Sequence, residues 1–82
     1  MVSKSSEVEL LLEELEHQLR HLDRSTTELQ AIVDAGLDEA GAPLTESDRK
    51  LYTDTIAENK SARLCKEARV SELRSLVQQC QL

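Results

Sequence analysis

The sequence predicts an all-α fold, in which two long helices form an antiparallel coiled-coil hairpin that associates further into a three- or four-helix bundle. Three observations predict it. From Val8 to Gly36, seam residues recur at alternating intervals of four and three. The stretch from Thr45 to Gln79 contains no glycine and no proline. The 82 residues include one aromatic side chain and 32% charged residues, a composition typical of paired helices.

A chain of this length predicts one domain, residues 1–82, and its first helix is predicted over residues 6–40. Ser6 and Glu9 have the spacing of a capping box, which favours a helix start at this point. Leu11 and Ile32 widen the apolar stripe beyond two positions in seven, which predicts more than one neighbouring helix. The residues at intervals of four and three form the seam of this helix: Val8, Leu12, Leu15, Leu19, Leu22, Thr26, Leu29 and Val33.

Two glycines are candidates for the end of the first helix. Gly36 could adopt a left-handed cap conformation, and Gly41 could do the same closer to Pro43. Proline disfavours helix at the residue before it and cannot donate a backbone hydrogen bond. The turn is therefore predicted within Gly36–Leu44 and is placed near Gly41, over residues 41–45.

The second helix is predicted over residues 46–80. Thr45 precedes Glu46 and Asp48, so a capping hydroxyl is followed by acids that suit the positive end of the helix dipole. The predicted seam of this helix is Tyr52, Ile56, Asn59, Ala62, Leu73, Leu76 and Val77. The same inward face is predicted to include Leu51, Thr55, Cys65, Lys66, Arg69 and Cys80.

A short turn makes the two helices antiparallel neighbours, with facing residue numbers that add up to about 85. In this register the polar residues Thr26 and Asn59 meet, as a register-setting pair would. Charge favours the same orientation. Residues 1–41 hold ten acids and three bases, a net charge of −7, while residues 42–82 hold six acids and seven bases, a net charge of +1.

A hairpin of this kind leaves apolar side chains on its flanks, and each one left exposed forgoes roughly 1.5–3 kcal/mol of burial. The expected partners are a second copy of the chain, as a dimer or tetramer, or another helical protein. The surface predicted to receive them consists of Leu11, Ile32, Leu37, Arg63, Lys66 and Arg69.

Composition argues against several other partners. A net charge of −6 disfavours nucleic acid and anionic membrane surfaces. The longest hydrophobic run is three residues, far below the length of a membrane-spanning helix or a signal peptide core. The expected location is the cytoplasm or nucleus, without secretion. Cys65 and Cys80 would be roughly 22 Å apart on one helix, which excludes a disulfide between them.

Glu13, His17 and His21 recur at intervals of four, a spacing that can bind zinc. They lie opposite the seam and lack a fourth ligand, so we interpret them as a solvated helix face and expect no metal or cofactor. A hairpin without a pocket also offers no place to assemble a catalytic group, so we do not expect an enzyme.

The expected function is a non-enzymatic coiled-coil protein–protein interaction module, a small subunit, scaffold or adaptor of a larger assembly of the cytoskeletal, trafficking, ciliary or kinetochore type. The alternative is a small helical chaperone or regulator that binds a client helix in its groove. A stable homodimer would favour the first hypothesis. A monomer that becomes helical only with a partner would favour the second.

Overall fold

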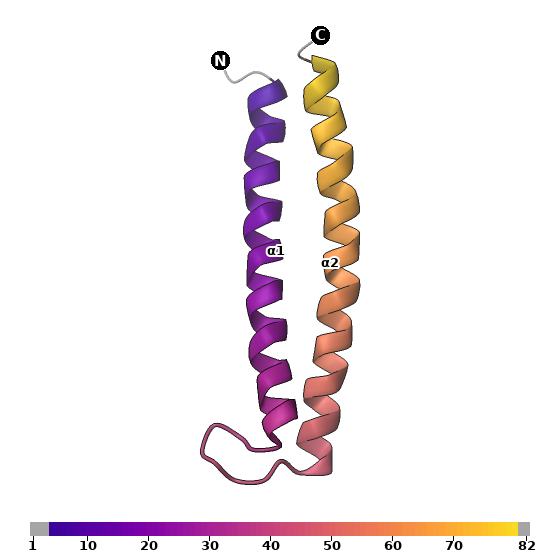
Figure 1. Ribbon diagram of the computed structural model, residues 1–82. Helices are drawn as coiled ribbons and strands as arrows, with labels where there is room; N and C mark the ends of the chain where they lie inside the picture. The colour runs from indigo at the N-terminus through magenta and orange to yellow at the C-terminus, as the bar shows by residue number, and fades with distance from the viewer. Residues whose placement is uncertain (1–3, 81–82) are drawn as a thin grey trace.

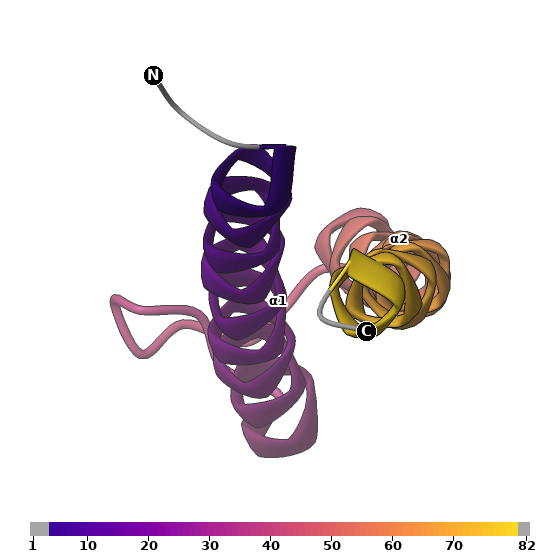
Figure 2. The same cartoon turned by 90° about the horizontal axis from the view of Figure 1, so that it is seen from above.

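The computed structural model describes residues 4–80 as two long helices joined by one loop (Figure 1). Helix α1 (Lys4–Ala35) and helix α2 (Glu46–Cys80) run antiparallel, and their free ends lie at the same end of the hairpin. Seen from above, α1 is tilted relative to α2 (Figure 2). The hairpin measures 57 × 20 × 15 Å, and its radius of gyration of 17.9 Å exceeds the value of about 12 Å for a compact domain of this length. The predicted all-α hairpin is confirmed.

Both ends of α1 differ from the prediction. The helix begins at Lys4, so Ser6 lies within its first turns and does not cap it. It ends at Ala35, well before residue 40, because Gly36 terminates it. Gly36 has φ +69°, a conformation that glycine adopts without steric cost, and its N–H donates to the carbonyls of Ile32 (3.0 Å) and Val33 (3.2 Å).

The connecting loop is closed by its own hydrogen bonds. The Asp38 carboxylate accepts the N–H groups of Ala40 and Ala42, both at 2.9 Å, and the Leu44 N–H donates to the Gly36 carbonyl at 3.0 Å. The Thr45 hydroxyl then accepts the Asp48 N–H at 3.0 Å, which confirms the predicted cap of α2. These bonds bring the two helix ends together.

The register of the two helices is fixed by hydrogen bonds in the middle of the hairpin. They join residues whose numbers add up to 84–86: Asn59 with Ser25 and Thr26, Arg63 with Asp23, and Lys66 with Gln18. With a sum of 85, the seam of α1 faces a row of α2 that has the same spacing of four and three. The facing pairs are Val8–Val77, Leu12–Leu73, Leu15–Val70, Leu19–Lys66, Leu22–Arg63, Thr26–Asn59, Leu29–Ile56 and Val33–Tyr52.

This inner row of α2 differs from the predicted one in its second half. Val70, which the predicted seam omits, is 6% exposed, while Leu76, assigned to the seam, is 44% exposed. Leu51, Cys65 and Arg69 are exposed as well. The physical reason is that the two helices stay in contact along their length, so the inner row of α2 keeps the same spacing of four and three residues throughout. The row therefore continues through Arg63 and Lys66 despite their charge. Their long aliphatic stems can lie along the seam while their charged ends reach water.

The core of the hairpin is thin. Among the described side chains, those of Ile56, Val70 and Leu73 are buried, with Leu73 the most enclosed at 2% exposure. The seam residues of α1 are all half-buried, and so are the inner-row residues of α2 from Tyr52 to Val77 that are not buried. Two helices can cover each other along one face, so most of these side chains keep part of their surface in water.

Candidate functional site

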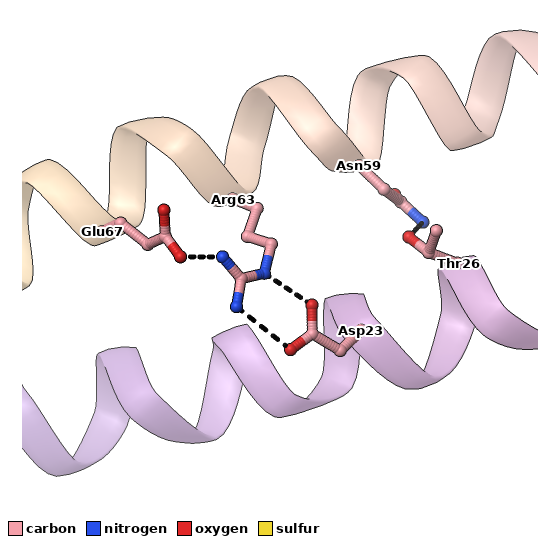
Figure 3. A network of polar contacts seen from close by, with 5 residues as sticks. All are labelled: Asp23, Thr26, Asn59, Arg63 and Glu67. Carbon is pink, nitrogen blue, oxygen red and sulfur yellow. Dashed lines mark hydrogen bonds and ion pairs between the residues drawn. The ribbon is translucent and has the colours of Figure 1, made fainter.

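A polar layer joins the two helices near their middle. The Asn59 side-chain amide donates to the Thr26 hydroxyl at 3.3 Å (Figure 3). It also donates to the Ser25 hydroxyl at 3.2 Å. The predicted pairing of Thr26 with Asn59 is therefore confirmed. A partly buried polar contact of this kind disfavours other registers, because a shift would leave the amide without a partner.

Replacing this pair tests its role. We expect the double variant Thr26→Leu and Asn59→Leu to melt at a higher temperature, because two apolar side chains then meet in the seam. We also expect a less well-defined oligomer, because the contact that fixes the register is gone. Calorimetry and light scattering on the same samples measure both effects. An unchanged melting temperature and an unchanged mass would contradict the pairing.

The next layer is organised around Arg63. Its Nε donates to Asp23 Oδ1 at 2.6 Å, its Nη2 lies 3.4 Å from Asp23 Oδ2, and it also forms an ion pair with Glu67 on its own helix (Figure 3). The hydrogen bond with Asp23 raises the pKa of Arg63 above its ordinary value. The contribution of Arg63 to stability is therefore present at neutral pH and is lost only as the pH rises through that raised pKa. The three side chains stay 40–52% exposed, so this network favours the register more than it adds stability.

Lys66 occupies the following layer. Its Nζ donates to Gln18 Oε1 at 2.7 Å, and it has no ion pair among the residues that the structure describes. Its side chain is half-buried and lines a hollow with His17, Gln18, His21 and Leu22. The middle of the inner row thus consists of an amide and two cations, between apolar segments at both ends.

The hairpin has two different long sides. With Leu12 at heptad position a and Leu15 at position d, the e positions of both helices form one side and the g positions the other. The e side is charged and carries ion pairs between the helices. Besides Arg63 with Asp23, Arg74 Nη2 lies 2.7 Å from Glu16 Oε1. The e side consists of Glu9, Glu16, Asp23 and Gln30 on α1, Leu37 in the loop, and Thr53, Lys60, Glu67 and Arg74 on α2.

The g side is less charged, and its exposed apolar side chains lie near the termini. Leu11 is 51% and Leu76 is 44% exposed at the end near the termini, while Ile32 is half-buried at the other end. The long side chain of Arg69 is exposed and pairs with Glu72 on its own helix at 3.0 Å. The g side consists of Leu11, Gln18, Ser25 and Ile32 on α1 and Thr55, Ala62, Arg69 and Leu76 on α2.

The residues predicted to receive a partner are thus divided by the structure. Leu11 and Arg69 lie exposed on the g side, with Ile32 half-buried among them, and Leu37 is 45% exposed in the loop. Arg63 and Lys66, predicted as flanking residues, belong to the inner row, and of the two only Lys66 was also predicted on the inward face of α2. The prediction missed Asp23 as a cross-helix partner. The numbers of Asp23 and Arg63 add up to 86, close to the predicted sum of about 85, and this was the signal that could have identified the pair.

The remaining predicted features give no assembled site. His17 and His21 are exposed, and within the described part of the chain no three His, Cys, Asp or Glu side chains are grouped to hold a metal ion. Cys65 is a free, exposed thiol, whereas the Cys80 side chain lies outside the described residues. Neither α1 nor α2, as described, is long and apolar enough to cross a membrane.

Comparison with known proteins adds no assignment to this geometry. No family model, no curated protein and no solved structure matches the chain.

Proposed function

We propose that this chain is a non-enzymatic coiled-coil interaction module, which acts by pairing its helices with further helices as a small subunit or adaptor of an assembly. The observation that supports this most directly is the thin core. The two helices bury three of the described side chains, while large apolar residues such as Leu10, Leu11 and Leu64 stay more than half exposed. A hairpin with so little enclosed apolar surface gains stability when more helices cover it.

The exposed area supports the same proposal. The chain has 6237 Å² of accessible surface, whereas a compact monomer of 9.2 kDa has about 4,900 Å². The excess of about 1,300 Å² is larger than the roughly 800 Å² that each partner contributes to a stable interface. The chain therefore has enough surface for a full-sized helical interface.

Stability as a function of concentration tests this function. For a self-associating module, we expect the melting temperature to rise with chain concentration over about a hundredfold range, because association stabilises the folded state by mass action. Circular dichroism gives the helicity and melting temperature, and light scattering gives the mass. A poorly helical monomer would place the missing helices in a different protein. A fully helical monomer whose melting temperature is independent of concentration would contradict helix pairing as the function.

A further inference from the structure

We propose that a second copy of this chain covers the g side, and that the two hairpins pack antiparallel about a two-fold axis across the middle of the bundle. This inference rests on the proposed function and names its partner and surface. The axis would pass between Gln18 and Ser25 on α1 and between Ala62 and Arg69 on α2.

The two sides of the hairpin differ in whether their side chains already have partners on the opposite helix. On the e side, Arg74 and Arg63 already reach acids of the opposite helix, at 2.7 Å and 2.6 Å. Covering that side would remove water from these charges, which is costly. On the g side the exposed groups at the open end are Leu11 and Leu76, whose burial is favourable. A second hairpin therefore fits the g side.

The g side is complementary to itself when one copy is inverted. Its four layers are Leu11 with Leu76, Gln18 with Arg69, Ser25 with Ala62, and Ile32 with Thr55. Inversion places the leucine layer of one copy against the Ile32 layer of the other, so apolar groups meet at both ends. It also places the long side chains of Gln18 and Arg69 against the small side chains of Ser25 and Ala62. Large groups facing small ones can pack without overlap.

The parallel arrangement is worse because of charge. It would bring the layers of both copies to the same height, so the two Arg69 side chains would share one layer of the bundle. Like charges across an interface cost free energy and act against that orientation. In the antiparallel arrangement, Arg69 of one copy faces Ala62 of the other. The two guanidinium groups are then offset by about one heptad, roughly 10 Å along the bundle.

Cys65 reports the orientation. It is a free, exposed cysteine next to the middle of the g side. In the antiparallel dimer α2 faces α2 of the other copy, so the two Cys65 thiols lie on either side of the axis at the same height. In the parallel dimer α2 faces α1, and the two Cys65 residues belong to diagonally opposed helices.

The experiment uses the full chain with Cys80→Ser, so that Cys65 is its single cysteine. We expect sedimentation equilibrium to give twice the monomer mass of 9.2 kDa, and a short bis-maleimide to give a covalent dimer. Leu76→Lys should raise the dissociation constant by at least about a hundredfold, because both copies lose a buried leucine. Leu64→Lys is the matched control. Leu64 is 68% exposed and lies outside the g side, so this variant should stay dimeric and cross-linked.

Three results would overturn the inference. One is a dimer that does not cross-link through Cys65, whereas a chain with Leu76→Cys as its single cysteine does cross-link. That pattern indicates the parallel orientation, which brings the two copies of residue 76 to the same height. Another is an equal dissociation constant for the Leu76→Lys and Leu64→Lys dimers, with helicity retained in both variants. The third is a monomeric parent chain. If that monomer is poorly helical, the proposed function survives with a different partner; if it is fully helical with concentration-independent melting, both proposals fail.

Discussion

A chain carrying Leu73→Asp is expected to lose most of its helicity and its cooperative thermal transition. Leu73 is 2% exposed and faces Leu12, so the new carboxylate would have no cation in its layer. An unpaired charge in such a position costs several kcal/mol. The whole free energy of unfolding of a domain of this length is roughly 4–12 kcal/mol. Circular dichroism during thermal unfolding measures the effect.

Leu64→Asp is the matched control on the same helix. Leu64 is 68% exposed, so the identical chemical change should alter the free energy of unfolding by under about 1 kcal/mol. The contrast separates burial from the general effect of placing an aspartate in a helix. Equal loss of stability in the two variants would show that Leu73 does not lie in the core.

Leu22→Asp illustrates what the sequence alone would have missed. Leu22 is central in the seam, which makes it the natural choice for a disruptive substitution. In the structure it is half-buried and faces Arg63, so an aspartate there would have a guanidinium in its own layer. We expect this variant to be less destabilised than Leu73→Asp. The difference depends on the row of α2, which the sequence pattern did not identify correctly.

The fold and the first seam could be predicted because α1 carries an almost unbroken row of aliphatic residues. That row alone defines the direction of the helix face and, with a short turn, the hairpin. The pairing of Thr26 with Asn59 followed from the same counting, since the numbers of these two polar residues add up to 85. The Asn59 amide donating to the Thr26 hydroxyl at 3.3 Å bears it out.

The inner row of α2 could not be read from hydrophobicity. Choosing apolar residues selects Ala62 and adds Leu76 beside Val77, whereas packing against α1 with constant spacing selects Arg63, Val70 and Val77. The end of α1 was ambiguous for a different reason. Both Gly36 and Gly41 have positive φ, and the hydrogen bonds of the loop decide which one terminates the helix.

Replacing both cations of the inner row, by Arg63→Leu with Lys66→Leu, should raise the melting temperature by about 5–15 °C. The two new leucines would face Leu22 and Leu19 and extend the apolar core through the middle of the hairpin. Burial of two half-covered leucines, less the loss of the two exposed ion pairs of Arg63 and the hydrogen bond of Lys66, gives a net gain of roughly 1–2 kcal/mol. Asp23 is 52% and Glu67 42% exposed, so their carboxylates stay hydrated without Arg63.

Lys50→Leu is the control for this prediction. The Lys50 side chain is 77% exposed, so the same type of change should shift the melting temperature by no more than about 2–4 °C. Both variants are compared with the parent chain at one concentration, because association also moves the melting temperature. If the double variant were less stable than the parent, Arg63 and Lys66 would be stabilising the hairpin through their polar contacts. The structure predicts the opposite: the two cations interrupt the apolar core of the hairpin and fix its register at a cost in stability.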